Sequence, residues 1–176
     1  MSSASGPAWR VHLGTAAMTC VRFAVARPED RDPWPLSRVV ASVCSLGAER
    51  GDRPHAAGAG RGVPIVHRQE LTWSGCTLLL EAHRLADSAE VSLELPSWDE
   101  LTDIVAEELA VWDLVDTVAD ACDARWGAIG DGEALGAAPE LRRHVGVLVR
   151  PADSTSFGIT RPYLVLERCG LAVLLR

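Results

Sequence analysis

The side chains of this 176-residue chain that are best suited to chemistry are carboxylates, and they are concentrated in one stretch. That stretch holds twelve acidic residues and no basic residue: Asp87, Glu90, Glu94, Asp99, Glu100, Asp103, Glu107, Glu108, Asp113, Asp116, Asp120 and Asp123. Two neighbouring carboxylates can act as general acid and base or hold Mg²⁺, as Glu107 with Glu108 or Asp113 with Asp116 could do. Because no His or Lys accompanies them and their neighbours are so similar, the pattern singles out no catalytic or metal-binding pair.

The charge balance favours protein binding instead. Outside the acidic stretch the chain has a net charge of +5, since seventeen arginines face twelve acidic residues. Exposed helices usually mix acidic and basic residues at i, i+4, and each such pair contributes ~0.2–0.5 kcal/mol. No such pair can form within this stretch. Either arginines from elsewhere in the fold cover the acidic face or a basic partner docks on it, and nucleic-acid binding through it is disfavoured.

The acidic stretch is therefore our candidate for a partner-binding surface on a basic protein. The residues predicted to make it are Asp99, Glu100, Asp103, Glu107, Asp113, Asp116 and Asp120. We predict no catalytic residue, metal ligand or cofactor.

The thiols and imidazoles offer a weaker alternative, a small enzyme. The cysteines are Cys20, Cys44, Cys76, Cys122 and Cys169, without a CxxC motif or zinc-ligand spacing, which is typical of buried free thiols in a reducing compartment. A Cys–His dyad could assemble in space from Cys76 with His83 or from Cys20 with His12. The motifs that usually accompany such dyads are absent, as are Walker, GxSxG, HExxH and dinucleotide-binding motifs. The chain has no Lys, which excludes Schiff-base and P-loop chemistry.

The helices and strands expected from the sequence pattern predict one α+β domain over 1–176, with a mostly antiparallel sheet of hairpins. We expect a loose tail over 1–7, a Gly/Arg-rich surface loop over 47–62 and a helical turn at 139–143. Strands are predicted at 9–13, 18–26, 63–67, 77–83, 90–95, 125–129, 145–149, 163–166 and 171–175. A helix is predicted over 36–49, because apolar residues recur there at helical spacing.

The acidic stretch contains the second helical segment, over 98–123, packed on the sheet. Ser97 and Glu100 form a capping box at its start. The apolar residues follow two stripes rotated by about a quarter turn, which predicts two helices meeting near 109–111 or one helix that bends there. Trp98 and Trp112 lie on one stripe and are predicted to be core anchors.

The cysteines, the N-terminal residues and the composition together predict a soluble, cytoplasmic protein. It is 48% hydrophobic and 23% charged, as expected of a folded chain, and its lack of Lys and Asn is typical of a GC-rich genome. The N-terminal residues lack the pattern of a secretory signal, and no apolar run approaches the ~20 residues that span a bilayer.

The order of elements from about residue 76 onward resembles that of some immunity proteins of bacterial polymorphic-toxin systems. A hairpin precedes the helix ending in WDLVDTVADAC at 112–122, then come DARWGAIGD at 123–131, HVGVL at 144–148 and a terminal hairpin. The resemblance covers roughly the last 100 residues. It implies a small cytoplasmic α+β protein without catalytic activity that binds and blocks a cognate toxin, and an acidic face suits a basic toxin such as a nuclease. The alternative to such a binding protein is a structural subunit of a larger assembly, held by exposed tryptophans.

Overall fold

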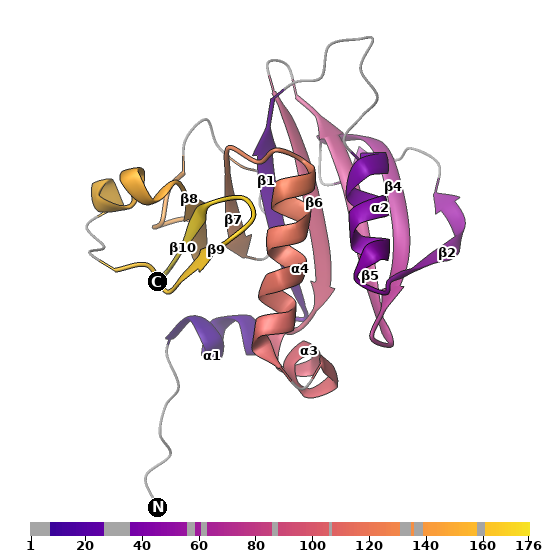
Figure 1. The fold of residues 1–176 in the computed structure, drawn as a ribbon, viewed down its shortest axis with the longest axis horizontal. Helices are drawn as coiled ribbons and strands as arrows, with labels where there is room; N and C mark the ends of the chain where they lie inside the picture. Colours follow the sequence, from indigo (N-terminus) through magenta and orange to yellow (C-terminus); the bar gives the residue numbers. More distant parts are fainter. Residues whose placement is uncertain are drawn as a thin grey trace, which may run out of the picture.

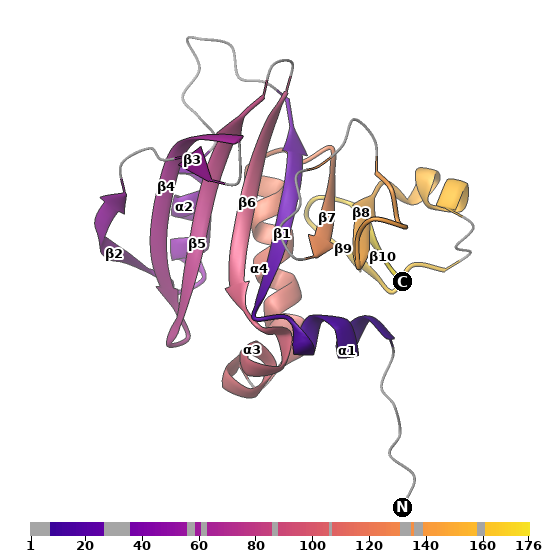
Figure 2. The same cartoon turned by 180° about the vertical axis from the view of Figure 1, so that it is seen from behind.

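A long antiparallel sheet organises the chain in a computed structural model that describes residues 8–26, 36–55, 59–60, 63–85, 88–105, 107–130, 135, 139–157 and 161–176 (Figures 1 and 2). The strands are β1 Met18–Val25, β2 Glu49–His55, β3 Ala59–Gly60, β4 Val63–Trp73, β5 Cys76–Arg84, β6 Ala89–Pro96, β7 Trp126–Gly130, β8 Gly146–Val149, β9 Leu164–Leu166 and β10 Leu171–Leu175. Their order in the sheet is β2-β4-β5-β6-β1-β7-β8-β10-β9, and β3 pairs with β4 beside this path. The predicted antiparallel α+β architecture is confirmed.

Five helical elements accompany the strands within the described residues. They are α1 Ala8–Thr15, α2 Leu36–Ser45, α3 Trp98–Val105, α4 Glu108–Ala121 and the 3₁₀ helix η1 Pro151–Phe157. The helices α2 and α4 lie together on one face of the sheet, in front of it in Figure 1 and behind it in Figure 2. The helices α1 and α3 lie near one end of the central strands (Figure 1). No helix in the part of the chain that the structure describes is long and apolar enough to cross a membrane.

The main core lies between the sheet and α2 and α4. In α2 the buried residues Leu36, Val39, Val40 and Val43 form the predicted helical stripe. In α4 the buried residues run almost continuously from Val111 to Ala121, so this helix is enclosed on most sides. Each fully buried large apolar side chain contributes about 1.5–3 kcal/mol relative to exposure, which holds the helices on the sheet.

Two predicted segments have a different secondary structure from the one expected. The strand predicted at 9–13 is wrong, because this segment belongs to α1. Its buried residues are Trp9 and Leu13, four positions apart on one helical face, whereas Val11 between them is 54% exposed. The segment 47–62, predicted as a loop, contains β2 and β3. The edge strand β2 accommodates its Gly and Pro because it pairs on only one side, with a register shift between Arg50 and Pro54. The predicted tail at 1–7 lies outside the described residues.

The acidic segment forms two helices, as one of the two alternatives predicted, but the break comes earlier than 109–111. The helix α3 ends at Val105, and Glu107 has an extended backbone and precedes α4. The sequence pattern places the break between the helices too late, because Leu109 fits the first apolar stripe in sequence yet is 69% exposed. The apolar stripe of α4 therefore begins at Val111.

Candidate functional site

The helix α3 presents its acidic residues to solvent because its apolar residues face the core. Trp98 and Leu101 are buried. At its start the Glu100 backbone N–H donates to Ser97 Oγ at 3.3 Å, which confirms half of the predicted capping box. The predicted residues Asp99, Glu100, Asp103 and Glu107 are all exposed.

Two exposed apolar side chains lie close to these four carboxylates in the sequence. Ile104 is 46% exposed on α3, and Leu109 follows at the start of α4. Within the described residues, none of the four carboxylates forms an ion pair or hydrogen bond with another side chain. The Asp99 carboxylate lies against the backbone of Gly14 in α1, where an added Cβ would collide with it. We call Asp99, Glu100, Asp103, Ile104, Glu107 and Leu109 the α3 surface.

The acidic residues of α4 have different roles. Asp116 is only 5% exposed, and its two carboxylate oxygens accept the backbone N–H groups of Arg168 at 3.0 Å and Cys169 at 3.1 Å. It thus holds the turn between β9 and β10 and is not available to a docking partner. Asp113 pairs with the Arg168 guanidinium at 3.2 Å, while Asp120 is exposed.

A second arginine provides a hydrogen-bond donor to the last turn of α4. Arg38 of α2 donates to the backbone carbonyl of Ala121, and a cation at this position also complements the helix dipole. Arg168 and Arg38 thus contact parts of α4, in line with one of the two alternatives for the acidic stretch, although Asp113 itself stays about half exposed. In the described part of the chain no arginine pairs with the four α3-surface carboxylates.

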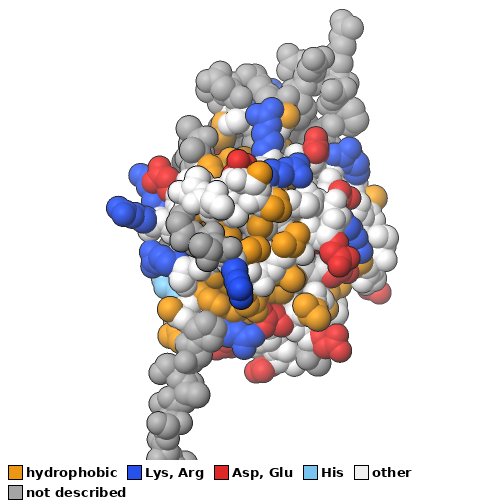
Figure 3. Space-filling view, turned by 60° about the vertical axis from the view of Figure 1, so that its left-hand side comes forward, with side chains coloured by type: hydrophobic (Ala, Val, Ile, Leu, Met, Phe, Trp, Pro, Cys, Tyr) orange, Lys and Arg blue, Asp and Glu red, His pale blue; other side chains and the backbone are white. Residues whose placement is uncertain are grey.

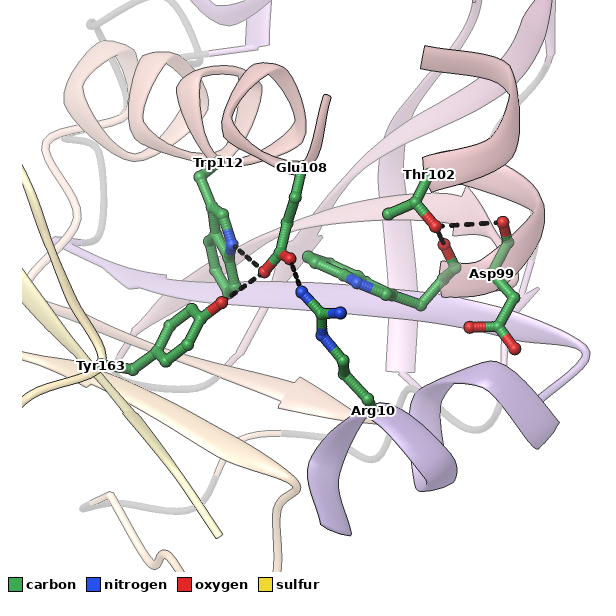
Figure 4. Close-up of polar contacts among 7 residues, drawn as sticks. Arg10, Asp99, Thr102, Glu108, Trp112 and Tyr163 are labelled. Carbon is green, nitrogen blue, oxygen red and sulfur yellow. Dashed lines mark hydrogen bonds and ion pairs between the residues drawn. The ribbon is translucent and has the colours of Figure 1, made fainter. Parts of the chain in front are cut away.

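Glu108, which we did not predict as a site residue, joins three segments at the start of α4 (Figure 4). Its carboxylate accepts Trp112 Nε1–H at 3.2 Å and the Tyr163 hydroxyl at 2.5 Å, and it pairs with Arg10 of α1. Burial raises the pKa of Tyr163, and the hydrogen bond to Glu108 adds to that rise. In the sequence, only the i, i+4 spacing of Glu108 and Trp112 indicates that these two side chains could contact each other.

Aromatic rings pack beside this carboxylate. The ring centroids of Trp98 and Trp112 are 5.1 Å apart, and those of Trp9 and Tyr163 are 5.2 Å apart. Trp9, Trp98 and Trp112 are buried, which confirms Trp98 and Trp112 as core anchors. These three side chains therefore do not supply the exposed tryptophans that the assembly alternative would use.

The sheet also contains a group of buried polar residues, on the side away from α2 and α4. His83 Nε2 lies 3.0 Å from Ser92 Oγ and 3.4 Å from Glu81 Oε2. The hydrogen bond with His83 is the main cause that lowers the pKa of Glu81. Beside them Arg22 pairs with Glu90 at 3.0 Å.

Ser, His and Glu are the residues of a hydrolase triad, but their arrangement here differs from one. In a triad the Ser and the carboxylate contact different nitrogens of the imidazole. Here both contact Nε2, and Nδ1 has no hydrogen-bond partner among the residues that the structure describes. Ser92 is also fully buried, so its hydroxyl is inaccessible to a substrate. These residues form a structural network across β5 and β6.

The structure does not bring together the two Cys–His pairs considered from sequence. Cys76 faces the main core at the start of β5, whereas His83 lies seven residues further along the strand, a rise of about 23 Å. Cys20 is buried in β1 and His12 is exposed on α1. Burial raises the pKa of Cys20 to about 11 and those of Cys122 and Cys169 to about 12, so these thiols are protonated at neutral pH. Within the described residues no cluster of His, Cys, Asp and Glu could hold a metal ion.

Comparisons with known proteins give only distant likenesses among solved structures. No protein-family model matches the chain, and no curated protein matches it significantly. Among solved structures the chain is similar to the Pseudomonas aeruginosa T6SS protein PA0821, with 11% sequence identity and a TM-score of 0.41. The similarity covers 79% of this chain and 60% of that chain. A likeness of this size assigns no function to the chain.

Proposed function

We propose that this protein is a non-enzymatic, immunity-like binding protein that docks a basic protein partner through the α3 surface. The observation that carries the proposal is the set of four exposed carboxylates, without ion pairs to other described residues, in the same segment as the exposed Ile104 and Leu109. The sequence resemblance to immunity proteins suggests a toxin as the kind of partner.

The composition of the α3 surface suits a protein interface. Interfaces combine an apolar centre, which supplies affinity when it is desolvated, with a polar rim. Here Ile104 and Leu109 provide the apolar side chains and the carboxylates provide the rim. Acidic rims attract basic partners over about a Debye length, so association is fast at low salt and slows as salt rises.

The absence of catalytic activity is part of the same proposal. It is supported by the raised pKa values of Cys20, Cys122 and Cys169, since a catalytic thiol requires a lowered pKa. The burial of Ser92 supports it further. Uniformly slow alkylation of all five thiols by iodoacetamide at pH 7 is the expected result, and one fast thiol would contradict a non-enzymatic role.

The test of docking is affinity capture from native-host lysate at low and moderate salt. We expect wild-type protein to retain a basic protein at low salt and to lose it as salt rises. The variant Glu100→Arg/Asp103→Arg should retain at least about tenfold less, because it reverses two charges of the α3 surface.

A matched control carries the same charge change elsewhere. Glu49→Arg/Glu167→Arg alters exposed residues of β2 and of the β9–β10 turn, and it should capture the partner as wild type does. Equal capture by the α3 variant would show that docking uses another surface. A large fall in its Tm would show that the α3 carboxylates stabilise the fold instead, and capture of nothing by wild type would remove the basis of the proposal.

A further inference from the structure

A groove lies at the end of the molecule that carries η1 (Figure 1), and it shares no residue with the α3 surface. It is lined by residues 139–142, by η1, by the ends of β7 and β8, and by Arg176 after β10. It consists of two adjoining hollows of about 430 and 490 Å³, which share Pro139, Ser156 and Phe157. Figure 3 shows this side of the molecule, where apolar side chains have arginines around them.

The floor of the groove is apolar. Trp126, Leu141 and Phe157 are partly buried and pack on a small second core of Val147, Val149 and Leu174. Their remaining exposed surface offers contacts to an apolar side chain from outside. Large aromatic surfaces of this kind are common anchors of binding energy at interfaces.

Arginines line both hollows. Arg125 and Arg150 line the first, and Arg142 and Arg176 line the second, all of them exposed. Within the described residues the side chains of Arg125 and Arg142 form no ion pair or hydrogen bond.

The other two arginines are each positioned by a backbone carbonyl. Arg150 Nη1 donates to the carbonyl of Cys169 at 2.8 Å, and Arg176 Nη1 donates to that of Arg142 at 3.0 Å. One hydrogen bond leaves most of the five guanidinium N–H donors available to a ligand.

Acidic residues of the groove do not balance these charges. Asp153 lines the first hollow and Glu140 the second, and Glu140 is paired with Arg143 at 3.2 Å. Among the described lining residues, four arginines thus face two carboxylates, one of which has its own cation. This described lining is positive, whereas the α3 surface is negative.

We propose that this arginine groove binds an acidic peptide segment of a partner protein, with an aromatic or large aliphatic side chain between carboxylates. Guanidinium groups recognise carboxylates through two parallel hydrogen bonds, which gives both charge and geometric complementarity. A single small anion would fill one hollow only. A peptide segment can place carboxylates at both hollows and its apolar side chain on the Phe157 ring between them.

The proposal is independent of the α3 surface, because the two sites share no residue and require partners of opposite charge. The Glu100→Arg/Asp103→Arg variant should therefore keep the full affinity of the groove. Failure of either site leaves the other testable with its own probe.

The test uses fluorescence anisotropy of a fluorescein-labelled peptide, Asp-Glu-Phe-Glu-Asp, with the full-length protein. We expect saturable binding that is at least about tenfold weaker for the uncharged peptide Asn-Gln-Phe-Gln-Asn, because the carboxylates supply the ionic contacts. The variant Arg125→Gln/Arg142→Gln should weaken binding of the acidic peptide by about tenfold or more. The control Arg50→Gln, on the far edge strand β2, should leave it unchanged.

Three results would overturn the proposal. Equal affinity for the two peptides would show that carboxylates are not recognised, and equal affinity of the Arg125→Gln/Arg142→Gln variant would place binding elsewhere. Tighter binding of AMP than of the acidic peptide, lost in the same variant, would assign the groove to a nucleotide instead. Circular dichroism of each variant checks that the surface substitutions leave the fold intact.

Discussion

The helices α3 and α4 belong to one acidic stretch without a basic residue, yet they use their carboxylates in opposite ways. The α4 residue Asp116 is enclosed between the helix and the β9–β10 turn, where two backbone N–H groups require an acceptor. The α3 residues Glu100 and Asp103 lie where no described element covers them. A run of like charges therefore does not define a surface; the segments that pack against each helix decide which carboxylates remain available.

Among the substitutions that test this difference between α3 and α4, the largest loss of stability is expected at Asp116. We predict that Asp116→Ala lowers the free energy of unfolding by about 2–4 kcal/mol, because it leaves the N–H groups of Arg168 and Cys169 without their acceptor. Urea denaturation measures the change. Asp120→Ala, at an exposed position of the same helix, is the control and should stay within about 0.5 kcal/mol of wild type. Similar losses from both variants would contradict the structural role of Asp116.

A smaller loss is expected at Glu108, the first residue of α4, whose carboxylate is partly buried and contacts two other segments. Glu108→Ala should lower the free energy of unfolding by about 1–3 kcal/mol, since the Trp112 and Tyr163 donors lose their acceptor. Thermal unfolding followed by circular dichroism gives the shift. Glu107→Ala, one residue earlier and exposed, serves as the comparison. An unchanged Tm for Glu108→Ala would mean that this junction does not stabilise the fold.

The α3 surface should show the smallest stability effect. Glu100→Arg/Asp103→Arg is expected to change the free energy of unfolding by less than about 1 kcal/mol, because the lost helix-dipole interaction of Glu100 is offset by relief of like-charge repulsion. Urea denaturation of this variant and of Asp116→Ala compares the loss of unfolding free energy at the two helices directly. A loss as large as that at Asp116 would remove the distinction between them.

The smallest expected effect is a shift in the titration of Tyr163, the one tyrosine of the chain. Because burial, and then the hydrogen bond to Glu108, raise the pKa of Tyr163, its phenolate absorbance should appear at a pH above the ordinary value of about 10. The folded state disfavours the phenolate, so the contribution of this group to stability is present below that pH and is lost as the pH rises through the raised pKa. Glu108→Gln should lower the pKa but not restore the ordinary value, since burial remains. An unshifted midpoint in wild type would contradict the contact between Tyr163 and Glu108.

Sequence patterns were sufficient for strands and helices whose burial follows a simple period. Val91, Leu93 and Leu95 alternate in β6, and Leu36, Val39 and Val43 recur at helical spacing in α2. The pattern failed at α1, because Trp9, Val11 and Leu13 alternate as in a strand although only the first and last are buried. The pattern also predicted no strand at β2. This strand pairs with β4 through backbone groups, and the order of its side chains gives no sign of that pairing.

The candidate site was predictable only in part. The sequence indicates where the carboxylates lie along α3 and α4, and Asp99, Glu100, Asp103 and Glu107 are exposed as a docking role requires. It cannot indicate that Arg168 and Arg10 reach Asp113 and Glu108, because those partners come from distant segments. The arginine groove is likewise assembled from residues between 125 and 176 that share no motif.

The position of β1 in the middle of the sheet determines when the chain can fold during synthesis. Met18 pairs with Pro96 on one side, and Cys20 pairs with Gly130 on the other. The backbone groups of β1 therefore find their final partners only after β6 and β7, more than 60 and 100 residues later, have been made. Such non-local pairing slows folding and leaves an apolar strand exposed meanwhile, so chaperone demand should be greatest while residues between β1 and β7 are being made.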